Sequence, residues 1–188
     1  MKSLLYATGN AIKFRLADSV CQTFDLSLQQ ISMDIPEIQA HSGEEVARDK
    51  VLRMFEALQK PVVISDDSWM IPALKDFPGP YMKFFNGMFT AEDWLRLVEP
   101  LSDRRIILRQ VVAYQDKHQQ QLFYTDIEGV LLTEIRGRAP FPHMSITSFN
   151  SGKTSLAEDN QEEKSSISKA VTRTSWHDFC EWYTSLQD

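Results

Sequence analysis

The chain has 188 residues, 43% of them hydrophobic and 24% charged, which is typical of a globular protein with one domain or two small lobes. Its formal net charge of −6 disfavours binding to a nucleic-acid polymer, and no apolar run approaches the roughly 20 residues that would span a membrane. The two cysteines, Cys21 and Cys180, are too few for a disulfide framework or a metal cluster, and they favour a reduced, cytoplasmic setting.

Residues 3–7 form an apolar run that predicts a central strand, followed by a turn at Thr8, Gly9 and Asn10. Glycine and asparagine tolerate positive φ and suit a tight connection between a strand and a helix. The apolar residues that follow at helical spacing are Ile12, Leu16, Ala17 and Val20. Thr8 and Asn10 are therefore expected at a helix N-terminus, where backbone N–H groups attract anions, with Lys13 on the first turn. Ordinary helix capping beside a solvated lysine is the alternative interpretation.

A second strand is predicted within residues 26–35, and it ends before Pro36 and Glu37 because proline cannot continue a central strand. Ser42 and Glu45 have the spacing of a capping box, which predicts the start of a helix. The apolar face of that helix contains Ala47, Val51, Met54, Phe55 and Leu58. Lys50 lies on a different face of the same helix.

The third predicted strand is the β-branched run at residues 62–64, which leads into Asp66, Asp67 and Ser68. We expect Ser65 to end this strand, so that the two carboxylates are held rigidly where open α/β sheets bind ligands. Adjacent carboxylates repel one another, and a divalent cation would relieve that repulsion. A solvated turn with an aspartate cap is the alternative. The order strand, helix, strand, helix, strand predicts an α/β fold.

The second half of the chain is expected to form a second, antiparallel β lobe, because strand-like segments follow one another without helices between them. These segments are residues 105–114, 121–126 and 129–134. Before them, residues 77–85 form a rigid Pro-Gly-Pro turn that presents aromatic residues and Lys83 to a core, a pocket or a subunit contact. Thr90 is expected to cap a short helix, and further helices are predicted at residues 162–167 and 176–186.

Seven short motifs suggest a family when they are read together. They are residues 7–13 (Ala-Thr-Gly-Asn-x-x-Lys), 36–37 (Pro-Glu), 66–68 (Asp-Asp-Ser), 78–85 (Pro-Gly-Pro-Tyr-x-Lys-x-Phe), 136–137 (Arg-Gly), 153–158 (Lys-Thr-x-x-Ala-Glu, with one residue extra) and 162–168 (Glu-Glu-Lys-x-x-Ile-Ser). In this order they resemble the inosine/xanthosine triphosphate pyrophosphatases, which act on non-canonical purine nucleotides. The resemblance covers nearly the whole chain and identifies it as a divergent member.

The resemblance implies a fold and an activity. It implies one domain over residues 1–188, an elongated mixed α/β sheet with flanking helices and a second antiparallel β lobe, and an active-site cleft between the lobes. It also implies a homodimer that cleaves a nucleoside triphosphate to the monophosphate and pyrophosphate with Mg²⁺. Pyrophosphate release needs charge neutralisation, a held metal ion and a positioned water, which is the chemistry that lysines and carboxylates supply.

The same resemblance implies a role for individual residues. Thr8, Asn10 and Lys13 would contact the triphosphate. Glu37, Asp66 and Asp67 would hold the metal ion, and Asp67 would also orient or deprotonate the attacking water. The further residues that would bind substrate are Lys50, Ser68, Lys83, Phe141, Lys164 and Ser168. Which of the two aspartates is ligand and which is base stays open.

The chain departs from the family where the base is recognised. Residues 141–145 align with the family's purine-reading loop, but Met144 stands at its aspartate and accepts no useful hydrogen bond from a base. Lys169 and Ala170 replace the family's histidine and arginine. Losing such hydrogen-bond partners relaxes or redirects the choice of base. The phosphate end of the site therefore resembles the family, and the base end does not.

Two alternatives follow from these departures. One is a pyrophosphatase for a modified or pyrimidine nucleotide, whose base pocket would be formed by Phe141, His143 and Lys169. The other is a nucleotide-binding protein of the same fold that has lost catalysis. The adjacent Asp66 and Asp67 argue against the second alternative, because a protein without catalysis has no use for neighbouring like charges.

Overall fold

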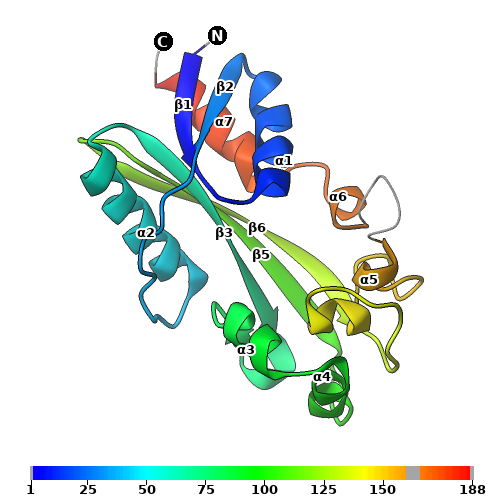
Figure 1. Ribbon diagram of the computed structural model, residues 1–188. Coiled ribbons are helices and arrows are strands. Elements are labelled where there is room, and N and C mark those ends of the chain that lie inside the picture. Colours follow the sequence, from blue (N-terminus) through cyan, green and yellow to red (C-terminus); the bar gives the residue numbers. More distant parts are fainter. Residues whose placement is uncertain (1, 160–165, 187–188) are drawn as a thin grey trace. The chain divides into compact units, whose positions relative to one another are not determined.

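A computed structural model describes residues 2–159 and 166–186 of the chain (Figure 1). Its strands are β1 (Lys2–Ala7), β2 (Leu26–Ile31), β3 (Val62–Ile71), β4 (Phe77–Gly79), β5 (Arg105–Gln115), β6 (Gln120–Leu131) and β7 (Thr147–Ser148). Its α-helices are α1 (Ala11–Gln22), α2 (Gly43–Leu58), α3 (Met82–Met88), α4 (Ala91–Val98), α5 (Leu156–Asp159), α6 (Ser166–Ala170) and α7 (Ser175–Ser185). Two 3₁₀ helices are η1 (Pro72–Leu74) and η2 (Pro142–Ile146).

The strands form one mixed sheet in the order β2-β1-β3-β5-β6-β7, with β4 paired to β3. Strand β1 runs parallel to both β2 and β3, as strand–helix–strand units require. The β3–β4 and β6–β7 pairs are antiparallel. The predicted α/β class, with a mixed sheet and flanking helices, is therefore confirmed. Within the described residues, no helix is both long and apolar enough to cross a membrane.

The chain divides into two compact units, and β3, β5 and β6 pass from one to the other. Unit 1 comprises Met1–Asp67, Gln110–Thr125 and Arg173–Asp188. Unit 2 comprises Ser68–Arg109 and Asp126–Thr172. Each unit has its own hydrophobic clusters, so each is described by itself below.

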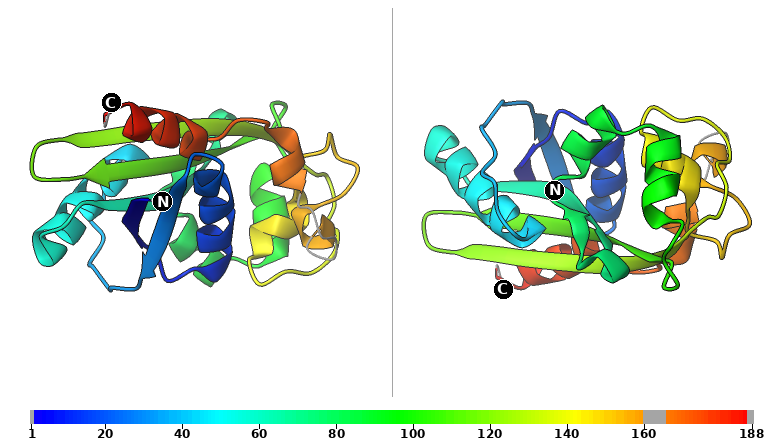
Figure 2. Two further views of the ribbon diagram at one scale, coloured as in Figure 1. Left: turned by 90° about the horizontal axis from the view of Figure 1, so that it is seen from above. Right: turned by 90° about the horizontal axis from the view of Figure 1, so that it is seen from below.

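Unit 1 has a hydrophobic cluster on each face of its part of the sheet. One cluster lies with α1 and α7 and includes Tyr6, Val63 and Phe179. The other lies with α2 and includes Val62 and Ile64. Successive strand residues point to opposite faces, which is why neighbouring residues of β3 belong to different clusters. Figures 1 and 2 show α2 on one side of β1 and β3, and α1 and α7 on the other.

Unit 2 packs around aromatic side chains. Trp94 of α4 is buried, and the Phe77 ring lies 4.6 Å from the Phe85 ring between centroids. Thr90 caps α4 through a reciprocal capping box with Asp93, as the sequence predicts. The core interpretation of the Pro-Gly-Pro segment therefore holds for Phe85, which packs in this cluster.

Two predicted strand boundaries are wrong. Strand β3 does not end at Ser65 but continues to Ile71, so Asp66 and Asp67 lie in its middle. The two segments predicted at residues 121–126 and 129–134 are one strand, β6. Gly129 lies within this strand, and a Cβ atom there would lie 2.7 Å from the Ser148 carbonyl oxygen. The glycine thus allows the close approach of β7.

Candidate active site

The alternation of β3 sends Asp66 and Asp67 to opposite faces of the sheet. Asp67 shares the face of Val63, which packs with α1 and α7, whereas Asp66 shares the face of Ile64, which packs with α2. Two adjacent like charges are thereby separated without any turn. Asp67 pairs with Lys13 of α1, whereas Asp66 is influenced by the charge of Lys50 of α2.

The two carboxylates lie just beyond the carboxyl end of β1. Strand β1 pairs with β3 at Leu5–Val62 and Tyr6–Val63 and ends at Ala7, whereas β3 continues. Strand β4 pairs with β3 only from Trp69 onward. The site therefore lies at the carboxyl end of a parallel strand, where α/β sheets bind ligands, but the strand that ends there is β1 and not β3.

On the α1 side, Lys13 Nζ lies 2.9 Å from Asp67 Oδ2. Local hydrogen bonds place Lys13 there: Asn10 Oδ1 accepts the backbone N–H groups of Ile12 and Lys13, and Thr8 Oγ1 accepts that of Asn10. Asn10 is thus the N-cap of α1, as predicted. Burial alone would lower the pKa of Lys13, but the charge and hydrogen bond of Asp67 outweigh it and raise that pKa. Lys13 therefore stays charged.

On the α2 side, Lys50 Nζ lies 2.5 Å from Oε1 of Glu37, which follows β2. The Asp66 carboxylate accepts the backbone N–H of Asp67 at 3.0 Å. Burial raises the pKa of Asp66, the charges of Lys50 and Lys13 act to lower it, and the charge of Glu37 acts to raise it. Asp66 is therefore electrostatically coupled to both lysine–carboxylate pairs.

The carboxylates of the site are oxygen donors of the kind that a magnesium ion prefers, but among the described residues they are not gathered into one metal-binding group. Within the described parts of the chain, no group of three or more His, Cys, Asp or Glu side chains is close enough to hold a metal ion. Mg²⁺ is commonly bound by one or two carboxylates together with water and substrate phosphates, so a complete protein cage is not required. Glu37, Asp66 and Asp67 offer hard oxygen ligands of that kind.

The predicted substrate residues of unit 2 differ in exposure. Ser68 is buried, Lys83 on α3 and Ser168 on α6 are exposed, and the Phe141 side chain is 53% exposed at the start of η2. Lys164 lies outside the described residues. Exposure leaves the Phe141 ring accessible to a flat ligand, whereas Ser68 is not accessible as it stands.

His143 is a core residue rather than the wall of an open pocket. Its Nδ1 lies 2.9 Å from Asn86 Oδ1, and its ring meets Trp69 edge-on at 4.7 Å between centroids. Burial lowers the pKa of His143 to about 4, so the ring is neutral at pH 7. Of the residues expected in a new base pocket, only Phe141 and Lys169 are exposed. The participation of His143 in such a pocket is therefore not supported.

Two further polar residues of the site lie outside the sequence-based set. The hydroxyl oxygen of Tyr6 lies 2.5 Å from Ser65 Oγ, directly beside the carboxylates. The sequence shows Tyr6 as one member of an apolar strand, and nothing local links it to Ser65. The parallel pairing of β1 with β3, once known, would have indicated this contact, because Tyr6 is the register partner of Val63.

The profile of the Ham1 family matches residues 4–172. The chain belongs to the Ham1 family. A Methanopyrus kandleri protein named dITP/XTP pyrophosphatase is 32% identical over 184 residues, which are 96% of this chain and 95% of that protein. An Ajellomyces capsulatus protein named inosine triphosphate pyrophosphatase is 32% identical over 171 residues, 89% of this chain and 90% of its own.

Solved Ham1 structures share the fold. A HAM1 protein from Coxiella burnetii superposes with a TM-score of 0.78 at 22% identity, covering 98% of this chain and 100% of its own. The Staphylococcus aureus Ham1 protein gives a TM-score of 0.72 at 19% identity, with both chains fully covered. The family profile and the sequence relatives confirm the resemblance inferred from the seven motifs, and these structures confirm the fold.

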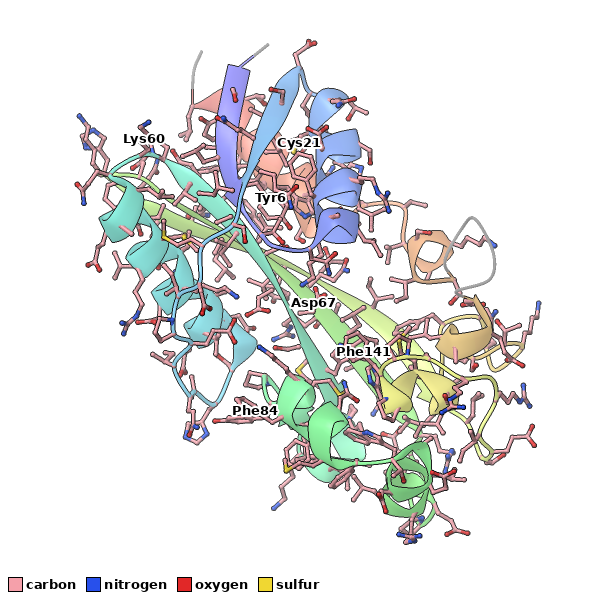
Figure 3. The ribbon with its side chains drawn as sticks, in the orientation of Figure 1. Tyr6, Cys21, Lys60, Asp67, Phe84 and Phe141 are labelled. Atoms are coloured by element: carbon pink, nitrogen blue, oxygen red, sulfur yellow. The ribbon has the colours of Figure 1, made fainter. Side chains whose placement is uncertain are left out.

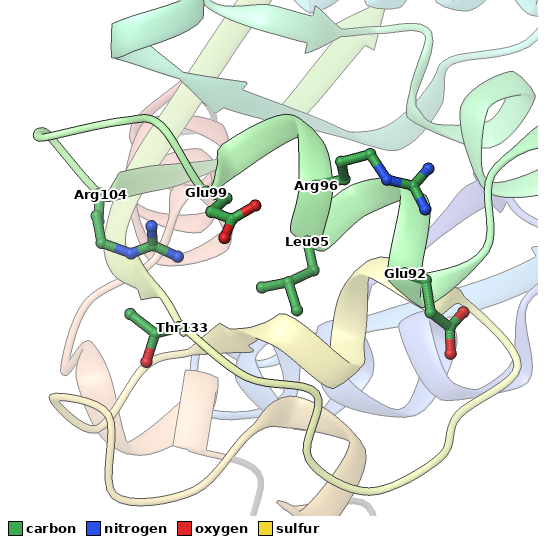
Figure 4. Close-up of a pocket in the computed structure, with 6 residues that line it drawn as sticks. All are labelled: Glu92, Leu95, Arg96, Glu99, Arg104 and Thr133. Carbon is green, nitrogen blue, oxygen red and sulfur yellow. The ribbon is translucent and has the colours of Figure 1, made fainter.

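Unit 2 of this Ham1 chain also has a surface hollow away from these motifs (Figure 4). It is lined by Glu92, Leu95, Arg96, Glu99, Arg104 and Thr133. The Arg104 guanidinium donates to the backbone carbonyls of Val98, Leu131 and Leu132. Arg104 therefore joins α4 to the end of β6, which is a structural role.

Proposed function

We propose that the chain is a Mg²⁺-dependent nucleoside triphosphate pyrophosphatase, which cleaves its substrate to the nucleoside monophosphate and pyrophosphate. The observation that carries this proposal is the pair of lysine–carboxylate contacts, Lys13–Asp67 and Lys50–Glu37. The charges of both lysines act on the carboxylate of Asp66. Lysines beside carboxylates at the end of a parallel strand are suited to a metal-bound triphosphate. Relatives named dITP/XTP pyrophosphatase support a non-canonical purine substrate.

In this proposal the triphosphate is bound by Thr8, Asn10, Lys13 and Lys50. The first turn of α1 contributes a partial positive charge at its N-terminus, although Asn10 already accepts two of its N–H groups. Both lysines are engaged with carboxylates when no substrate is bound. Phosphate oxygens would therefore compete with Asp67 and Glu37 for the two ammonium groups.

Glu37 together with Asp66 or Asp67 would hold the magnesium ion, with water and substrate phosphates as its other ligands. When bound, the ion neutralises the phosphate charge and polarises the phosphoryl group. Asp67 would also orient the attacking water or accept its proton. Because Asp66 and Asp67 lie on opposite faces of β3, they are suited to different tasks.

We propose that Lys83, Phe141, Lys164 and Ser168 also contribute to binding the substrate, whereas the buried Ser68 is not accessible to it in this structure. The exposed ring of Phe141 offers a stacking surface for a base. The proposal names no particular base, because Met144 and Lys169 offer neither the carboxylate nor the histidine of the family pattern.

We further propose that the protein is a cytoplasmic homodimer. Phe84 and Met88 of α3 are 59% and 66% exposed and lie four residues apart, so they share one face of the helix. Exposed apolar residues that gather on one face are typical of protein interfaces. Sedimentation at micromolar concentration that shows monomer alone would contradict the dimer.

A screen of nucleoside triphosphates for pyrophosphate release tests the activity. The panel includes ITP, XTP, their deoxy forms, the four common ribonucleotides and modified pyrimidines. We expect release to require Mg²⁺, to stop on chelation with EDTA and to recover when Mg²⁺ is restored. Activity that survives complete chelation would contradict the metal assignment, and no release from any nucleotide would contradict the enzyme itself.

A further inference from the structure

Tyr6 is completely buried beside the candidate active site. Its ring stacks on Phe14 of α1 at 6.2 Å between centroids and meets Trp176 of α7 edge-on at 4.9 Å. Its hydroxyl lies 2.5 Å from Ser65 Oγ. Figure 3 shows Tyr6 above Asp67, which lies further along β3. A phenol in this core is therefore fixed by packing on its ring and by hydrogen bonding of its hydroxyl to Ser65 and to the Thr8 side chain.

This hydrogen bond lies where the backbone pairing of β1 with β3 ends. The last register pair is Tyr6 with Val63. Ser65 is two residues further along β3, on the same face as Val63, and it immediately precedes Asp66. The hydrogen bond between the two hydroxyls thus links β1 to β3 one step beyond the last backbone pair. Its partner on β3, Ser65, is the residue directly before the two carboxylates.

The same tyrosine also touches the element that carries Lys13. Phe14 is the next residue of α1, so the stacked rings hold the first turns of that helix against β1. Thr8, whose Oγ1 supports the cap of α1, follows Tyr6 by two residues. Tyr6 thus contacts Phe14, which directly follows Lys13, and Ser65, which precedes Asp67 by two residues. Both partners of the Lys13–Asp67 ion pair therefore lie within two residues of a side chain that Tyr6 contacts.

Resting on the proposed function, we propose that Tyr6 and Ser65 are a positioning pair for pyrophosphate cleavage. Their hydrogen bond keeps the Asp66 and Asp67 carboxylates in register with Lys13. Burial raises the pKa of Tyr6, so its hydroxyl stays protonated and acts by hydrogen bonding rather than as a base. Neither residue is expected to touch the substrate.

Packing alone predicts a different outcome from positioning. If the ring only fills the core, Tyr6→Phe keeps every ring contact and leaves turnover unchanged. If the hydroxyl positions the site, Tyr6→Phe and Ser65→Ala each lower kcat, while Ser65→Thr retains a hydroxyl and retains activity. Because Tyr6→Phe already removes the hydrogen bond to Ser65, the double variant should be no worse than Tyr6→Phe alone.

The control is Tyr114→Phe. Tyr114 is buried in the same cluster as Tyr6 and donates a hydrogen bond from its hydroxyl to Asp116 at 2.9 Å. Removing that hydroxyl affects the stability of the same core without touching the β1–β3 connection. It should therefore lower the midpoint of thermal unfolding with kcat unchanged.

The experiment measures kcat, KM and thermal unfolding for the wild type and all five variants, with Mg²⁺ and the best nucleotide of the panel. We expect Tyr6→Phe and Ser65→Ala each to lower kcat by about tenfold to a hundredfold, as small misplacements do, with a smaller change in KM. Ser65→Thr should stay within about threefold of the wild type.

The results that would overturn the positioning pair differ from the result that would overturn the proposed function. An unchanged kcat in Tyr6→Phe, additive losses in the double variant, or an equal kcat loss in Tyr114→Phe would overturn the positioning pair while the proposed function stands. A folded wild type that releases no pyrophosphate from any nucleotide would overturn the proposed function, and the positioning pair would fall with it.

Discussion

Lys13 and Asp67 form an ion pair across the end of β1, with 2.9 Å between Nζ and Oδ2. Each side chain is about one-third exposed, 30% for the lysine and 29% for the aspartate, so a triphosphate can reach both. Because solvent screens a pair of this kind, it adds little to folding stability. The pair therefore matters more for what it offers to a substrate than for holding the fold together.

Replacing Lys13 should weaken catalysis more than folding. One charge-assisted contact to phosphate contributes about 1.5–3 kcal/mol, so Lys13→Ala should lower kcat/KM by about ten- to a hundredfold, with a higher KM and a lower kcat. Lys60→Ala is the matched control, since Lys60 is exposed at the far end of α2 in the same unit. Steady-state kinetics that show equal kcat/KM in the two variants would contradict a phosphate role for Lys13.

His143 should make the protein sensitive to mild acid. Its pKa falls from 6.5 to about 4 through burial, so the unfolded chain takes up this proton at a higher pH than the folded chain. The contribution of neutral His143 to the free energy of unfolding is therefore fully present above pH 6.5. It is lost as the pH falls toward 4, by about 3 kcal/mol at 1.36 kcal/mol per pKa unit.

Denaturant titrations between pH 7 and pH 4 measure this loss. His143→Phe removes the titrating group, so its free energy of unfolding should depend less on pH over that range than that of the wild type. His118→Phe removes an exposed histidine in place of a buried one and is the matched control, which should alter this slope less than His143→Phe does. If the wild type and His143→Phe have equal slopes, the burial of a neutral imidazole is refuted.

The two cysteines should be unreactive in the folded protein. Cys21 and Cys180 are both buried, with 3.4 Å between their sulfur atoms. The hydrogen bond that the two thiols share, together with burial, raises the pKa of Cys21 strongly, which removes the reactive thiolate. A thiol reagent should label the native wild type at least about tenfold more slowly than Ser19→Cys, whose new thiol lies on the exposed face of α1. Rapid labelling of the native wild type would show that this core opens readily.

Local patterns predict much of unit 1 correctly. Asn10 caps α1, Ser42 caps α2 through the Glu45 N–H at 3.2 Å, and the apolar face of α2 packs on the sheet. These features depend on neighbours within four residues, so spacing is enough to find them. The α/β order follows from the same information.

The errors arise where distant partners decide. Asp66, Asp67 and Ser68 look like the end of a strand because they interrupt an apolar run, but pairing with other strands carries β3 to Ile71. His143 is a polar residue in sequence, and its burial depends on Asn86 and Trp69. Such contacts between residues far apart in the chain leave no trace in local spacing, and neither does the bond between Tyr6 and Ser65.

The account depends most on Asp67, and Asp67→Asn tests it directly. Asparagine keeps the size of the side chain and one acceptor oxygen but loses the charge and the ability to accept a proton. Groups that act as general bases contribute about 10²–10⁴-fold, so turnover should fall by at least that range. Binding of a non-hydrolysable triphosphate should persist, because Thr8, Asn10 and Lys50 are unchanged.

The decisive measurement is single-turnover pyrophosphate release by Asp67→Asn, with calorimetric binding of a non-hydrolysable triphosphate measured on the same preparation. The account predicts that release falls by about a hundredfold or more while binding remains detectable. Release within tenfold of the wild type would place the catalytic centre away from Asp67 and contradict the account.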